Sequence, residues 1–142
     1  MKTKEFWEKL AVCLIFVVTA LIGTIGCPPP SAPSIEFTHI PAYGSTEDLR
    51  GKVGGVDVNE YQVAVYNYVL GYWNKPYFST PVTDINRDRT WDCDVTTGGD
   101  DIHATGYAAF LIPKGVEPPI CGPCAELPDI PESVAFTQYD RF

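Results

Sequence analysis

The stretch Tyr61–Leu70, with the sequence YQVAVYNYVL, decides the fold of this chain. Its valines Val63 and Val65 fall on one face of an extended strand. Its tyrosines Tyr66 and Tyr68 fall on the other face, because successive side chains of a strand point to opposite sides. The stretch therefore predicts a β-strand whose two faces meet different surroundings.

Shorter segments with the same alternation lie on both sides of this strand, and no stretch after residue 34 has an apolar period of 3.6 residues. Glycine, proline, asparagine and aspartate separate them, as is typical of turns. Without a helix to cross between parallel strands, about seven short strands predict an all-β, antiparallel two-sheet sandwich, with a small closed barrel as the alternative. The further expected strands are 35–39, 49–56, 71–78, 90–95, 104–112 and 133–139.

Residues 1–26 are interpreted as a signal peptide. Three lysines in Met1–Leu10 precede Ala11–Ile25, an apolar run of 15 uncharged residues. That length is typical of a signal-peptide core and is shorter than the roughly 20 residues that span a bilayer. The expected organisation is thus a signal peptide, a proline-rich tether over 27–33 and a β-sandwich domain over 34–142.

The junction Gly26-Cys27 resembles the lipobox of bacterial lipoproteins, in which the cysteine is acylated and becomes the first residue after cleavage. Thr24 stands where leucine is commonest, and Ile25 is bulkier than the usual residue. Cleavage by an ordinary signal peptidase and an uncleaved anchor are the alternatives. The resemblance implies a protein of the cell envelope, outside the cytoplasm, that is either secreted or attached to the membrane through a lipid on Cys27.

Charge limits the possible partners. The chain has 18 acidic and 10 basic residues, of which two acidic and three basic ones lie in residues 1–26. The remaining 16 acidic and seven basic residues give the mature part a net charge of −9. Such a surface repels phosphate backbones and anionic lipid headgroups. Nucleic acid is therefore not expected as a partner, and membrane attachment must come from the N-terminus.

Three cysteines follow the tether: Cys93, Cys121 and Cys124. In an oxidising compartment one pair among them is expected to form a disulfide, and the sequence leaves every pairing open. Cys121–Cys124 spells CGPC, the active-site tetrapeptide of thioredoxins. Prolines on both sides of it preclude the strand and helix that flank that motif, and only 18 residues follow it. A thiol-disulfide oxidoreductase is therefore the less favoured alternative.

Asp84, Asn86 and Asp88 match the opening of a calcium-binding loop. Arg89 and Val95 stand where such a loop has glycine and glutamate, so a polar hairpin turn is the favoured interpretation. The chain contains no nucleophile elbow, zinc-protease motif or phosphate-binding glycine loop. No cofactor and no catalytic activity are therefore expected.

Aromatic residues cluster between Tyr66 and Phe78, with Trp91 in the next strand. Flat rings with hydroxyl edges suit sugar rings and also protein partners, whereas the same rings can fill the core of a small β domain. We expect Trp91 to lie inside the sandwich. The candidate ligand-binding residues are Tyr66, Tyr68, Tyr72, Trp73 and Tyr77.

Five motifs carry a further resemblance: Gly55–Asp57, Tyr61–Tyr66, Trp73–Tyr77, Thr90-Trp91 and Cys93–Gly99. Together they are similar to small immunoglobulin-like sandwiches that accompany carbohydrate-active enzymes and surface lipoproteins of bacteria. The resemblance implies an immunoglobulin-like fold and a non-catalytic binding role, with carbohydrate as the favoured ligand and an envelope protein second. The alternative is a structural or adhesive envelope component whose aromatic residues are all buried.

Overall fold

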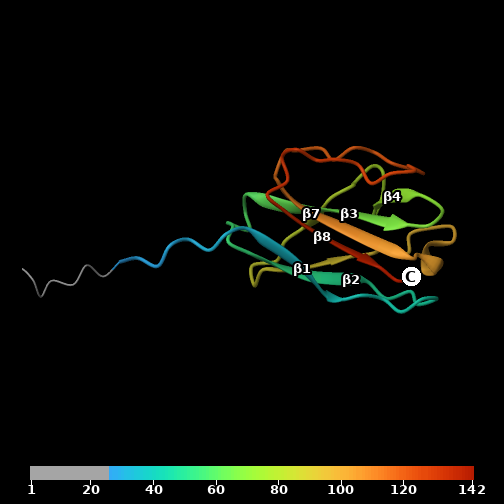
Figure 1. Cartoon of the computed structure of the whole chain (residues 1–142), viewed down its shortest axis with the longest axis horizontal. Coiled ribbons are helices and arrows are strands. Elements are labelled where there is room, and N and C mark those ends of the chain that lie inside the picture. Colours follow the sequence, from blue (N-terminus) through green and yellow to red (C-terminus); the bar gives the residue numbers. More distant parts are fainter. Residues whose placement is uncertain (1–25) are drawn as a thin grey trace, which may run out of the picture.

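The computed structural model describes residues 26–142, which form two antiparallel sheets packed face to face (Figure 1). The expected all-β sandwich is confirmed. The first sheet has the order β1-β2-β6, and the second has the order β4-β3-β7-β8 with β5 paired to β3. The elements are β1 (Ser34–His39), β2 (Leu49–Gly54), β3 (Tyr61–Tyr68), β4 (Tyr72–Lys75), β5 (Thr83–Asp84), β6 (Thr90–Cys93), the 3₁₀ turn η1 (Asp101–His103), β7 (Gly106–Pro113) and β8 (Ala135–Asp140).

The strand order is that of an immunoglobulin-like sandwich. The chain crosses from the first sheet to the second after β2, returns for β6 and crosses again for β7. The segment predicted to be a signal peptide lies, except for Gly26, outside the described residues. Within 26–142, no helix is both long and apolar enough to span a bilayer.

The main core lies between the two sheets. Trp91 on β6 is 1% exposed, and Val63 and Val65 on β3 are fully buried beside Leu49 and Leu111. These residues occupy alternate positions on their strands, as a buried inner face requires. The expectation that Trp91 lies inside the sandwich is confirmed.

A second core covers the outer face of the second sheet. The segment 114–134 between β7 and β8 crosses over that face (Figure 1). Its residues Cys121 and Ile130 pack with Ala64 and Tyr66 of β3 and with Phe110 of β7. Both faces of β3 are therefore buried, and Tyr66 has no exposed surface. The prediction that Tyr66 contacts a ligand is wrong, because this cover removes its ring from solvent.

The tether and the loop 94–105 lie at opposite ends of the sandwich (Figure 1). Residues 26–33 lead into β1 at Ser34, which pairs with Gly54 at the end of β2. At the other end, the loop 94–105 meets the connection between β1 and β2, where Gly44 donates its N–H to the Ile102 carbonyl. The structure therefore separates the N-terminal attachment from one loop-rich end.

Candidate functional site

A groove of about 490 Å³ opens at the loop-rich end. On one side it is bounded by the β3–β4 hairpin and on the other by the loop before η1. A volume of this size falls in the range of small-molecule binding sites. We call it the first groove. The residues that line it include Leu70, Trp73, Lys75, Phe78, Thr97, Asp100, Asp101 and Pro123.

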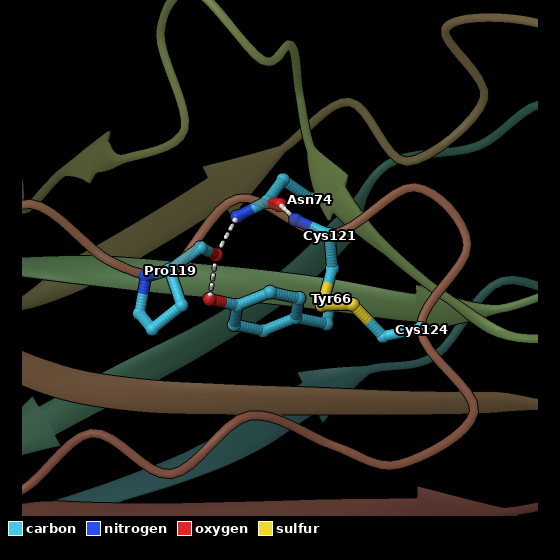
Figure 2. The surroundings of a disulfide bond; sticks show 5 residues. All are labelled: Tyr66, Asn74, Pro119, Cys121 and Cys124. Atoms are coloured by element: carbon cyan, nitrogen blue, oxygen red, sulfur yellow. Dashed lines mark hydrogen bonds between the residues drawn. A yellow bond between two sulfur atoms is a disulfide. The ribbon is translucent and has the colours of Figure 1, made fainter.

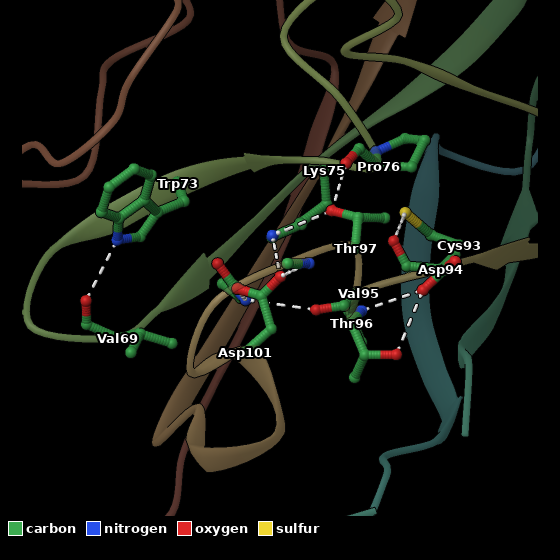
Figure 3. Close-up of polar contacts among 12 residues, drawn as sticks. Val69, Trp73, Lys75, Pro76, Cys93, Asp94, Val95, Thr96, Thr97 and Asp101 are labelled. Atoms are coloured by element: carbon green, nitrogen blue, oxygen red, sulfur yellow. Dashed lines mark hydrogen bonds and ion pairs between the residues drawn. The ribbon is translucent and has the colours of Figure 1, made fainter. Parts of the chain in front are cut away.

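Two aromatic rings form one wall of the first groove. The rings of Trp73 and Phe78 are nearly parallel, with 12° between their planes and 6.3 Å between their centroids. The indole Nε1 of Trp73 donates to the Val69 carbonyl at 3.0 Å, which fixes the ring in place (Figure 3). Phe78 remains 49% exposed. The wall thus offers apolar aromatic surface to a ligand.

A buried ion pair joins Lys75 and Asp101 beside this wall (Figure 3). Their side chains are only 7% and 9% exposed. Lys75 Nζ also donates to Thr97 Oγ1 at 3.2 Å. Asp101 accepts from Asn67 Nδ2 at 2.9 Å and from the Gly98 N–H at 3.0 Å. An ammonium has three N–H donors, and only two of those of Lys75 have acceptors among residues 26–142.

A second groove of about 620 Å³ lies on the other side of Phe78. Its walls are the β4–β5 connection and the beginning of the segment that covers the second sheet. We call it the second groove. The residues that line it include Gln62, Phe78, Pro81, Asp84, Glu117, Pro118 and Ile120.

Cys121 and Cys124 form a disulfide (Figure 2), whereas Cys93 is a free thiol. The loop that this disulfide closes pairs with the edge strand β4. The Tyr72 N–H donates to the Cys124 carbonyl at 2.8 Å, and the Cys124 N–H returns a bond to Tyr72 at 3.0 Å. Asn74 donates its N–H to the Cys121 carbonyl at 3.2 Å. The disulfide loop therefore extends the second sheet beyond β4.

Buried polar groups hold the chain just before the disulfide (Figure 2). The Pro119 carbonyl accepts from the Tyr66 hydroxyl at 2.7 Å and from Asn74 Nδ2 at 3.0 Å. The Asn74 side-chain oxygen accepts from the Cys121 N–H. Burial raises the pKa of Tyr66 to about 12, so its hydroxyl stays protonated as this donor at neutral pH. Tyr66 thus supports the wall of the site instead of touching a ligand.

The structure divides the other predicted binding residues between two surfaces. Tyr72 contacts Tyr68 edge-to-face at 4.9 Å between ring centroids, on the outer face of the sheet. Trp73 points to the opposite side of β4, into the first groove. Tyr77 is 53% exposed and lines a hollow of about 150 Å³ next to that groove. Trp73 and Tyr77 therefore lie together, apart from Tyr68 and Tyr72.

The lining residues of the first groove that the sequence did not predict include Lys75, Phe78, Thr97 and Asp101. Phe78 belongs to the aromatic run and could have been included on that ground. Lys75 follows Trp73 at the strand period, so its charge shares the inner face of β4. A lysine at an inward position signals a buried partner, although its identity, Asp101, is fixed only by the fold.

The predicted calcium residues do not converge on one point. Asp84 contacts Lys114 Nζ at 3.6 Å, and Asn86 donates to Thr90 Oγ1 at 3.1 Å. Asp88 accepts from the Thr90 hydroxyl at 2.6 Å, and these bonds to Thr90 lower its pKa. In the part of the chain that the structure covers, no three His, Cys, Asp or Glu side chains gather to share a metal ion.

The two unpaired cysteines among residues 26–142 differ in access. Cys27 is exposed in the tether, where acylation was expected. Cys93 is 2% exposed on β6, and burial raises the pKa of its thiol to about 12. A thiol with so high a pKa is a poor nucleophile at neutral pH. Cys93 is therefore a core residue.

No protein-family model, curated protein or solved structure matches this chain. The structure defines its class as an immunoglobulin-like sandwich with two grooves that meet at Phe78. Its function must therefore be inferred from the side chains of those grooves.

Proposed function

We propose that this protein is an exported, non-catalytic carbohydrate-binding module held at the cell envelope through Cys27. The observation that carries the proposal is the parallel pair Trp73 and Phe78 beside the unsatisfied donor of Lys75. A sugar ring has an apolar face and a rim of hydroxyl groups. The aromatic wall suits the face, and Lys75 suits a hydroxyl oxygen.

The polar groups of the first groove favour binding over catalysis. Asp101 is paired with Lys75 and also accepts bonds from Asn67 and Gly98. A carboxylate whose oxygens already accept hydrogen bonds from three donors has little capacity left to contact a substrate. The pair is therefore suited to orienting a ligand.

The position of the first groove supports a tethered binding role. It opens at the end of the sandwich opposite Ser34, where the tether enters (Figure 1). The tether contains Pro28, Pro29, Pro30 and Pro33, and such sequences form stiff, extended spacers. With a lipid on Cys27, the groove would face away from the membrane.

A glycan array tests the ligand class. The wild type should retain one or more glycans. Trp73→Ala should lose them because it removes the indole ring of the aromatic wall. Tyr43→Ala is the matched control, since Tyr43 is 55% exposed at the same end but lines neither groove. Circular dichroism must show that each variant folds. The absence of any retained glycan, or equal loss in both folded variants, would contradict the proposal.

The intact mass of the protein from a membrane fraction tests the attachment. We expect a chain that begins at Cys27 and carries the added mass of acyl groups. A chain that begins at the same residue without acyl mass would indicate an ordinary secreted protein. A mass that includes residues 1–26 would indicate an uncleaved anchor.

A protein partner from the envelope is the second candidate. Leu70, at the tip of the β3–β4 hairpin, is 93% exposed and lines the same groove as the half-exposed Phe78. Exposed apolar side chains gathered in one place are typical of protein contacts. The half-exposed rings of Tyr77 and Phe78 argue against a purely structural component with all its aromatic residues buried. Thiol exchange is less favoured because Cys121 is 2% exposed and no helix follows Cys124.

A further inference from the structure

We propose that the ligand is a linear, amine-bearing glycan whose chain crosses Phe78 and occupies both grooves. This inference rests on the proposed carbohydrate-binding function and narrows it in two respects. The first is the length of the chain that binds, and the second is its charge. Each follows from a different set of lining residues.

The length follows from the wall that the two grooves share. Phe78 lines both of them and is half exposed between them. The segment 115–123 also runs along both: Pro118 and Ile120 line the second groove, and Pro123 lines the first. Each groove has the volume of a separate binding site. A chain of several sugar units can therefore use both at once, whereas one or two units fill only one.

The segment 115–123, which runs along both grooves, is held in place before any ligand binds. Its disulfide loop is paired with Tyr72 and Asn74 of β4. The Pro119 carbonyl takes hydrogen bonds from Tyr66 and Asn74, both buried. A wall that is already ordered loses little conformational entropy on binding, so contacts along the whole chain add to affinity.

The charge follows from the carboxylates that line the grooves. Asp84, Asp100, Asp101 and Glu117 are lining residues, and Lys75 is the only lining cation. Lys75 neutralises Asp101, so the exposed carboxylates of the other three remain. The contact of Asp84 with Lys114 is a surface pair, with side chains 87% and 45% exposed, which screens little of that charge.

These carboxylates select the chemistry of the ligand. A chain of amino sugars places ammonium groups along both grooves and is attracted, whereas a chain of uronic acids is repelled. The N-acetylated form of the same chain keeps the ring geometry and lacks the charge. Glucosamine oligomers, their N-acetylated counterparts and oligogalacturonate therefore form a matched set of probes.

Isothermal titration calorimetry with the full mature chain tests both parts. At low salt we expect the glucosamine hexamer to bind about tenfold more tightly than its dimer and than the N-acetylated hexamer, and oligogalacturonate not to bind. Equal affinity for dimer and hexamer would overturn the two-groove part. Equal affinity for charged and N-acetylated hexamers would overturn the charge part. If a lysine-rich peptide bound as tightly as the charged hexamer, the inference that the ligand is a glycan would be overturned.

Variants distinguish the effect of the groove residues on binding from the effect of the overall charge of the protein. Glu117→Gln should weaken binding of the charged hexamer, and Asp92→Asn, an exposed site on β6 outside both grooves, should not. Ile120→Ser should weaken the hexamer and leave the dimer in the first groove unchanged. An equal effect of Glu117→Gln and Asp92→Asn would show a non-specific charge effect. Failure of every glycan to bind would instead contradict the proposed function itself.

Discussion

Lys75 and Asp101 form an ion pair in which both side chains are more than nine-tenths buried. The pair links the edge strand β4 to η1, so it joins the two sides of the first groove. Removing one partner leaves the other charge buried without compensation. We expect Asp101→Asn to lower the free energy of unfolding by about 3–5 kcal/mol, measured by urea denaturation.

A double-mutant cycle separates the pair from its surroundings. Lys75→Met keeps an unbranched side chain without the charged end and leaves Asp101 with two donors, Asn67 and Gly98. The double variant should be more stable than the sum of the single losses indicates, because the unpaired charge disappears with its partner. Additive losses would show that the two charges do not interact.

The sequence predicts the sandwich because the inner faces of its strands follow a simple alternation. Val63 and Val65 alternate with Gln62, Ala64 and Tyr66, and Trp91 alternates with Thr90 and Asp92. It does not predict the second core, because Tyr66 and Tyr68 look like an exposed face when β3 is considered alone. A signal was present in β7, whose GYAAFLIP run is apolar on both faces. Such a run indicates a strand covered on both sides.

The site was predicted less well than the fold. Trp73 and Tyr77 are close together in the sequence and in space, so the aromatic run locates one wall of the first groove. The other residues come from segments far apart in the chain: Asp101 is 26 positions from Lys75. No local pattern encodes such a contact. For the same reason the sequence does not determine the disulfide, since it is compatible with every pairing of the three cysteines.

The Cys121–Cys124 disulfide should contribute about 2 kcal/mol to stability, because it closes only a short loop. Cys121→Ser with Cys124→Ser should therefore remain folded but unfold at a lower urea concentration. Hydrogen exchange should become faster at the amides of Tyr72 and Asn74, which donate to the disulfide loop.

Reduction of the wild type should reproduce the effect of this double variant. Cys93→Ala supplies the control, since it keeps the disulfide and should respond to reductant as the wild type does. Unchanged exchange at Tyr72 and Asn74 after reduction would mean that the backbone pairing holds the loop without the disulfide.

Burial of Cys93 should make the protein less stable in alkali. The thiol pKa is about 12 in the folded chain against an ordinary value of 9.0. Below the ordinary value both states hold the proton, and the contribution of the thiol is fully present. As pH rises toward 12, the unfolded state releases the proton and the folded state keeps it, so stability falls.

Urea denaturation at about pH 8 and about pH 10 measures this loss. Cys93→Ser does not titrate in this range, so it should lose less stability between the two values than the wild type does. The tyrosines contribute equally to both proteins. An identical loss in the two would show that the thiol ionises as readily in the folded state as in the unfolded one.

Replacing Gly122 should disturb the aromatic wall of the first groove without unfolding the protein. A Cβ added at Gly122 would clash with Phe78 Cζ and lie 3.0 Å from Trp73 Cε3. Phe78 is half exposed and can swing aside, so Gly122→Ala should cost only about 1 kcal/mol of stability. The displaced ring no longer lies parallel to Trp73, and calorimetry with the glucosamine hexamer should show affinity reduced by about tenfold. Gly98→Ala is the matched control, because Gly98 also lines the first groove and has open space where its Cβ would be. Equal affinity of the Gly122 and Gly98 variants would show that the parallel rings do not bind the glycan.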